Sequence, residues 1–143
     1  MNLNEENHVV TINSIPKPRW NALIQLIPKI EEREQFGSLE GGDEIADGIK
    51  QMPYWDHSPV VSEFVKIVYE IPIVISFDWG SWQEGREIAN NPDFDFDSID
   101  IPTKCKLITA IVRNDRFSDG ALVSAFESGL ILKILRSIER QLR

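Results

Sequence analysis

The residues best suited to chemistry lie in the segment FDWGSWQEGRE, residues 77–87. Nine consecutive positions of this segment hold Asp78, Trp79, Trp82, Glu84 and Arg86. An indole ring offers a large apolar face and one N–H donor, which suits it to stacking on a ligand or anchoring a partner. A guanidinium group can clamp a carboxylate or a phosphate. The segment is therefore the first candidate for a binding site.

The same segment also has a structural interpretation. Ser81 followed by Glu84 fits a capping box, which predicts a helix over residues 82–89. Trp79 and Trp82 would then attach the start of that helix to the core. We favour this interpretation because the capping box accounts for Ser81 and Glu84 without any ligand.

A second candidate is a group of mixed charges in and after RNDRFSDG, residues 113–120. Its members are Arg113, Asp115, Arg116, Asp119 and Glu127. Mixed charges at a helix corner commonly pair with one another, so we favour a network that ties the C-terminal helices together. In the alternative, Arg113 or Arg116 faces a cleft together with Arg86 and the tryptophans.

A third candidate is the aromatic pair Tyr54 and Trp55, beside Asp56 and His57. These rings either form an exposed anchor or cover the core. His57 precedes a helix start, where a surface or capping role is more common than catalysis. With one cysteine, Cys105, which is expected in the core, the chain predicts no catalytic residue, no metal site and no cofactor.

Apolar residues at helical spacing predict the elements that must position these candidates. The expected helices cover residues 17–34 (kinked or split at Pro28), a stretch that starts at Pro59, residues 82–89, 101–112, a stretch from the cap at Ser118 to about Ser128, and residues 130–142. Ser58, Asp100 and Ser118 are expected to cap three of them, and Gly120 and Gly129 to form sharp corners.

The rest of the chain shows no long periodicity. The glycine-rich residues 36–48 predict a loop, whereas residues 49–55 and 71–77 predict short strands or extended segments. Residues 1–15 predict a flexible tail with a short extended piece at HVVTI. The expected fold is thus a mainly α, compact single domain, residues 16–143, with five or six helices and at most one or two short strands.

Charge is spread unevenly over the 143 residues. The net charge of −8 divides into −12 for residues 1–100 and +4 for residues 101–143. This acidity argues against direct binding of nucleic acid, which needs a dense basic surface. The cations at one face of the last expected helix, Lys133, Arg136, Arg140 and Arg143, predict a solvated face that complements the helix dipole.

The location expected from the sequence is the cytoplasm. The N-terminus MNLNEENHVV lacks the apolar region of a secretory signal, and no apolar run is long enough to span a membrane. A single cysteine fits a reducing compartment.

Several blocks resemble one family across residues 20–140. They are LIPKIE (26–31), GG followed by DG, QMPYW (51–55), SFDW (76–79), WQEGRE (82–87) and RNDRFSDGALVSAFESGLILKIL (113–135). The chain is similar in these blocks to a group of small bacterial proteins catalogued only as a domain of unknown function. The resemblance implies a bacterial, cytoplasmic, single-domain protein and no particular activity.

The sequence favours a binding or interaction module, whose ligand is a protein or a small molecule of cationic or aromatic character. One alternative is a small enzyme with a Trp/Arg-lined pocket, using Asp78, Glu84 or Asp119 as acid or base and Arg86 or Arg116 to hold an anion. Another is an acidic inhibitor that mimics nucleic-acid phosphate. A homodimer is left open.

Overall fold

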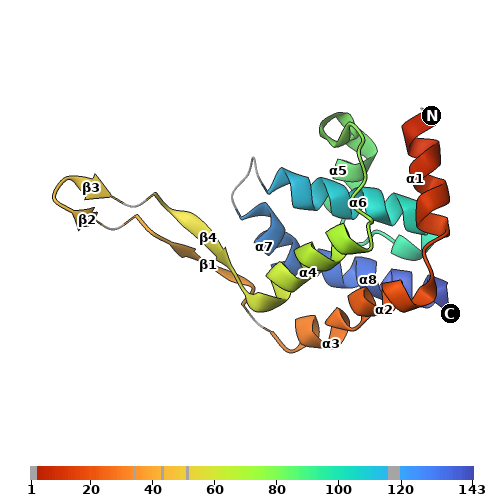
Figure 1. Cartoon of the computed structure of the whole chain (residues 1–143), viewed down its shortest axis with the longest axis horizontal. Coiled ribbons are helices and arrows are strands. Elements are labelled where there is room, and N and C mark those ends of the chain that lie inside the picture. The colour runs from red at the N-terminus through yellow and green to blue at the C-terminus, as the bar shows by residue number, and fades with distance from the viewer. Residues whose placement is uncertain (1–2, 34, 43, 51, 116–119) are drawn as a thin grey trace.

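The computed structural model describes residues 3–33, 35–42, 44–50, 52–115 and 120–143. The helices within these ranges are α1 (Leu3–Asn13), α2 (Lys17–Ile24), α3 (Leu26–Glu31), α4 (Pro59–Glu70), α5 (Gln83–Ala89), α6 (Ile101–Asn114), α7 (Ala121–Glu127) and α8 (Leu130–Leu142). Two short 3-10 helices are η1 (Trp79–Ser81) and η2 (Phe96–Ser98). The strands are β1 (Gly37–Glu40), β2 (Glu44–Ala46), β3 (Ile49–Lys50) and β4 (Tyr54–His57). The prediction of a mainly α single domain is confirmed (Figure 1).

Helix α8 lies at the centre of the helical body. It packs against α2, α3, α6, α7 and η2. Its apolar face is fully buried, through Ile131, Ile134, Leu135 and Ile138. Gly129 begins it with a φ of 84°, so the glycine expected at this corner does supply the left-handed backbone that the turn requires.

The helix starts predicted by the sequence differ in outcome. Asp100 caps α6 as expected, since its Oδ1 accepts a hydrogen bond of 2.9 Å from the backbone N–H of Thr103. The capping box at Ser81 is wrong, because Ser81 belongs to η1 and α5 starts after Trp82 with no side-chain cap. Helix α7 begins after Gly120, and the expected cap Ser118 lies outside the described residues.

The N-terminal segment is the first correction to the expected elements. The extended piece expected at HVVTI is wrong, because these residues belong to α1, which packs against α6. Ile12 is buried at its end, whereas Val10 is exposed. An apolar face this narrow gives little periodic signal, and docking on the domain stabilises the helix.

The segment between α4 and α5 does not form the short strand that was one of its two predicted forms. Residues 71–72 make a turn at the end of α4, and residues 73–76 have no regular secondary structure, with Ile71, Ile73 and Ile75 buried in alternation. The backbone N–H of Ile75 donates to Thr109 Oγ1 at 3.1 Å, which ties the segment to α6.

The expected loop at residues 36–48 is the second correction. Strands β1 and β4 pair antiparallel, with Leu39 opposite Trp55 and Glu40 opposite Tyr54, and β2 pairs with β3 beyond them. We call residues 37–57 the arm, and it projects away from the helical body (Figure 1). Gly41, at a φ of 83°, lets the chain after β1 approach the chain before β4, because a Cβ there would lie 2.5 Å from the carbonyl oxygen of Met52.

Candidate functional site

A cleft between α5 and α6 holds three of the residues expected to form a site. Trp79, Trp82 and Arg86 line this cleft of about 260 Å³. Its other lining residues are Gly85, Ala89, Leu107, Ala110, Ile111 and Asn114. The small side chains of Ala89 and Ala110 leave space that larger ones would fill. We call it the α5–α6 cleft.

Trp82 is fixed in place at one wall of this cleft. A Cβ on Gly85 would lie only 2.2 Å from Trp82 Cε3, so the indole ring lies directly on the backbone of α5. Phe77 packs edge-on against the same ring, with centroids 5.5 Å apart. The Lys106 ammonium lies 4.9 Å from the centroid of the Trp82 ring. The ring is thus held by the fold before any ligand binds.

The other described residues of the first two candidates do not line the cleft. Asp78 and Glu84 are exposed, and neither lines it. The alternative in which Arg113 faces this cleft with Arg86 has no support, because Arg113 lies outside the lining and its Nε is buried. Neighbouring positions on a helix point about 100° apart, so Asn114 reaches the cleft and Arg113 does not. Arg116 and Asp119 lie outside the described residues.

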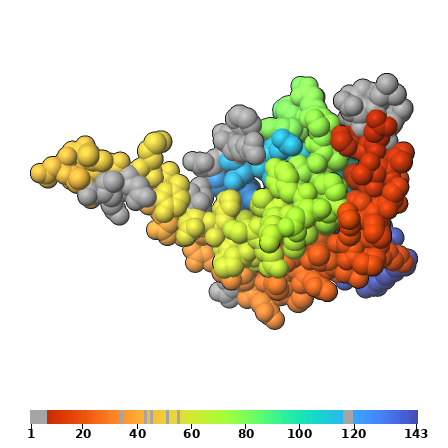
Figure 2. Space-filling view, viewed as in Figure 1, coloured from red at the N-terminus to blue at the C-terminus, as the bar shows by residue number. Residues whose placement is uncertain are grey.

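The arm forms a second surface of functional interest. In the described part of the chain, four of the six exposed large apolar residues lie on it: Leu39 (61% exposed), Ile49 (56%), Met52 (82%) and Tyr54 (46%). Tyr54 is therefore exposed and does not cover the core, while the side chain of Trp55 is outside the described part. Figure 2 shows the arm standing clear of the body.

The base of the arm is anchored to the body by several contacts. Phe36 precedes β1, is buried, and packs against Phe126 with ring centroids 5.4 Å apart. The backbone N–H of Ser58 donates to the carbonyl oxygen of Phe36 at 2.9 Å, which closes the hairpin. A Cβ on Gly37 would lie 2.8 Å from Val123, so β1 leaves the body in close contact with α7. The arm is therefore packed against the body at its base, around Gly37, and exposed further out, where Leu39, Ile49, Met52 and Tyr54 lie. We call this outer part the shaft.

Asp115 joins the arm to the C-terminal helices. Its Oδ1 accepts a 3.0 Å hydrogen bond from the backbone N–H of Leu122, and its Oδ2 lies 3.4 Å from His57 Nε2. Asp115 thus ties this corner to β4 and to α7, but no ion pair joins it to another described member of the predicted charge network. Ser58 adjoins His57, but its Oγ is buried without a hydrogen bond to any described residue, so the three side chains do not form a catalytic triad.

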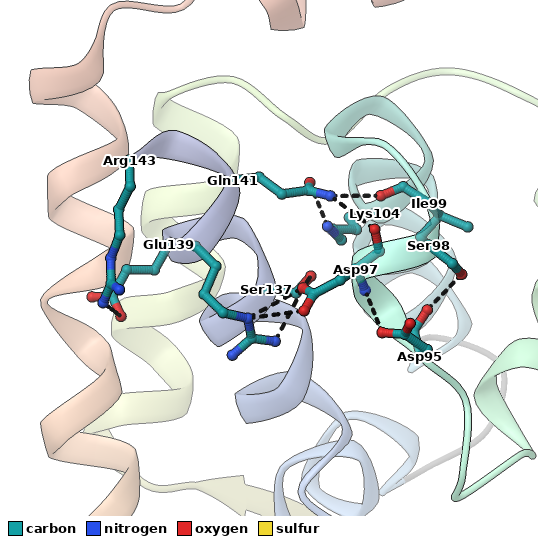
Figure 3. Close-up of polar contacts among 10 residues, drawn as sticks. Asp95, Asp97, Ser98, Ile99, Lys104, Ser137, Glu139, Gln141 and Arg143 are labelled. Carbon is teal, nitrogen blue, oxygen red and sulfur yellow. Dashed lines mark hydrogen bonds and ion pairs between the residues drawn. The ribbon is translucent and has the colours of Figure 1, made fainter.

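A polar cluster that the sequence did not predict joins α8, η2 and α6 (Figure 3). Asp97 accepts hydrogen bonds from Ser137 Oγ at 2.5 Å and from Arg140 Nε at 3.0 Å. These bonds, that of Ser137 most of all, hold the pKa of Asp97 below its usual value. The cationic face of α8 is therefore more than a solvated surface, because Arg140 bonds Asp97 and Arg136 lies 2.6 Å from Glu31 of α3.

Lys104 is the buried member of this cluster. Its side chain is fully buried in α6, and its ammonium donates a hydrogen bond to Gln141 Oε1. Burial lowers the pKa of Lys104 to about 8, because removal from water disfavours the ammonium. No local signal in the sequence indicates that α8 and η2 cover this lysine. Its neighbour Cys105 is buried as expected.

No helix among the described residues is long and apolar enough to cross a membrane.

The comparisons with known proteins identify a family and nothing more. A search of curated proteins and a search of solved structures found no match. A family model described as "Family of unknown function (DUF6508)" matches residues 15–143, which is nearly the whole chain. The chain therefore belongs to this family of unknown function.

Proposed function

We propose that the protein is an interaction module that binds a partner protein through its arm. The observation that carries this proposal is the contrast between the packed base of the arm and its exposed apolar shaft. Large apolar side chains gathered on a projecting element commonly mark a protein interaction site. The packed base holds the shaft in one orientation, so the shaft does not have to become ordered when the partner binds.

The charge of the arm defines the chemistry of the partner. Residues 37–57 contain five carboxylates and one lysine, a net charge of −4. The fitting surface is an apolar groove with a basic rim, which complements both the exposed side chains and the carboxylates. Pairing between the arms of two copies is disfavoured, because like charges would face each other across the ribbon.

Site-specific crosslinking in cells tests this proposal. A photo-crosslinking residue is placed at Met52 or, for comparison, at Tyr69, which is exposed on α4 of the helical body. We expect position 52 to capture one protein that position 69 does not. That protein is then purified and its affinity measured. Met52→Ser should weaken binding at least tenfold, as expected of an interface hot spot, and Tyr69→Ser less than twofold.

Charge reversal on the arm supplies the second part of the experiment. Glu40→Lys should slow association with the purified partner, and the effect should shrink as salt is added. The proposal is contradicted if both crosslinking positions capture the same proteins, if the captured protein is a second copy of this chain, or if Met52→Ser binds as tightly as the wild type.

The acidic inhibitor is a special case of this proposal, in which the basic partner surface is one that binds nucleic acid. The exposed carboxylates Glu40, Glu44 and Asp56 on the projecting ribbon support it. A short DNA duplex would then compete with this protein for the partner. The enzyme alternative has less support, because none of the described residues that line the α5–α6 cleft is a carboxylate.

A bacterial cytoplasmic location also belongs to the proposal. The single, buried cysteine is compatible with a reducing compartment. The resemblance of the sequence blocks to small bacterial proteins gives it further support. Cell fractionation with an antibody against the chain tests the location.

A further inference from the structure

We propose that the α5–α6 cleft binds a small planar aromatic molecule that carries a carboxylate. This site is separate from the arm and does not depend on the function proposed for it. The inference rests on the shape of the cleft, on the two indole rings that line it, and on the sign of its charge.

The shape and lining favour a flat apolar ring. Most of the lining side chains are apolar, and the two tryptophans are half-buried, so each presents part of its ring to the cleft. Aromatic rings pack favourably against indole by stacking or edge-on contact. A volume of about 260 Å³ lies just below the usual range for drug-sized ligands, which indicates a ligand of one or two fused rings.

The charge of the lining favours an anion. Arg86 is the one charged residue among the described residues that line the cleft. Its side chain is exposed, and it has no ion pair with any other described residue. A guanidinium at the rim of an apolar cleft matches the planar carboxylate of a ring bound below it. The overall acidity of the chain suggested a cationic ligand, but the local charge has the opposite sign.

The fold holds the cleft ready for such a ligand. Trp82 lies against the backbone of Gly85 and the edge of Phe77, so binding need not order this ring. The opposite wall is one face of α6, where Leu107, Ile111 and Asn114 follow one another at helical spacing.

Binding of 2-naphthoate, measured by calorimetry and by NMR shifts, tests the proposal. We expect saturable binding with a dissociation constant on the order of 10⁻⁴ M, given the size of the probe. The neutral analogue 2-naphthamide should bind about tenfold more weakly, because it lacks the charge-assisted contact with Arg86. The shifted resonances should come from α5 and α6.

Two variants locate the site. Arg86→Gln should weaken 2-naphthoate about tenfold and change 2-naphthamide less than twofold. Ala89→Phe should fill the cleft and abolish binding of both compounds; Ala89 is at the exposed end of α5, so the fold should tolerate the larger ring. Lys66→Gln, an exposed position on α4, removes the same charge far from the cleft and is the control.

Three results would overturn the proposal. The first is no saturable binding of 2-naphthoate at millimolar concentration. The second is equal affinity for the acid and the amide, which would assign the cleft to an apolar side chain of a partner. The third is unchanged binding of 2-naphthoate to a folded Ala89→Phe variant, with folding checked by circular dichroism.

Discussion

Lys104 shows at the scale of one residue how the fold alters chemistry. Its charge is buried among α6, α8 and η2, and one hydrogen bond, to Gln141 Oε1, compensates for part of the lost hydration. Gln141 in turn donates to the carbonyl oxygen of Ile99 at 3.0 Å, so the lysine is held by a short chain of polar contacts. A buried ammonium with little compensation lowers stability wherever it is charged.

The pH dependence of unfolding should reveal this cost. The pKa of Lys104 is about 8 in the folded state, and an unfolded lysine has a value of about 10.4. Between these values the unfolded state binds more protons, so the free energy of unfolding rises with pH. We expect Lys104 to contribute a gain on the order of 1–2 kcal/mol between pH 7.5 and 9.5. Urea denaturation at a series of pH values measures it.

A comparison of variants isolates this contribution. Lys104→Met should lose the rise between pH 7.5 and 9.5 relative to the wild type. Lys66→Met, at an exposed lysine of α4, should keep it. Parallel pH curves for the wild type and Lys104→Met would show that Lys104 keeps an ordinary pKa in the folded protein.

At the scale of the element, the arm depends on its base. Phe36 packs against Phe126, which also contacts Phe64 of α4 edge-on with centroids 5.2 Å apart. Leu39 lies only three residues further along the chain but is exposed on the shaft. The boundary between structure and interaction surface therefore falls inside β1.

Two truncations on either side of this boundary should differ sharply. Phe36→Ala removes a buried ring and should lower the free energy of unfolding by about 3 kcal/mol. Leu39→Ala removes an exposed side chain and should change it by about 0.5 kcal/mol or less. Denaturation of the two variants in urea measures both values. Similar losses for the two would mean that the shaft also packs against the body in solution.

The sequence predicts the helices better than the arm because the two depend on different signals. Apolar spacing of 3.6 residues marked α4, α6 and α8, and Asp100 and Gly129 marked two of their ends. The strands of the arm bury little, so they have no apolar alternation to detect. The sequence Asp47-Gly48 between Ala46 and Ile49 is a hairpin signal that could have identified the arm, and Gly48 does take a φ of 75° there.

The cleft was predictable only in part. Trp79, Trp82 and Arg86 stand out because their residue types are unusual within one short segment. Their partners on α6 do not, because the packing of α5 against α6 is a long-range contact that no local pattern specifies. Asn114 was absent from the prediction for that reason, and Arg113, which has the charged side chain, does not line the cleft.

At the scale of the whole molecule, folding brings oppositely charged parts of the chain together. Arg136 and Arg140 of α8 lie against Glu31 and Asp97 from the acidic first hundred residues. Such exposed pairs contribute little stability each, but they neutralise the acidic body around α8. The arm contains one lysine among its five carboxylates, so a net negative charge stands beside its exposed apolar side chains.

The family match and the fold together make a prediction about α1. The match starts at residue 15, directly after this helix, so residues 15–143 should fold without it. Ile12 is nevertheless only 2% exposed, and its loss should leave part of α6 uncovered. We expect the chain 15–143 to keep its helical circular dichroism but to lose about 2 kcal/mol of unfolding free energy.

Point variants in the full chain decide whether Ile12 is the cause. If it is, Ile12→Ala should account for most of the loss caused by truncation, whereas Val10→Ala, at an exposed position of the same helix, should change stability little. A chain 15–143 as stable as the whole protein would mean that α1 is dispensable, as expected of a flexible tail. A chain 15–143 that fails to fold would mean that α1 belongs to the core, because the burial of one isoleucine is too small to account for such a loss.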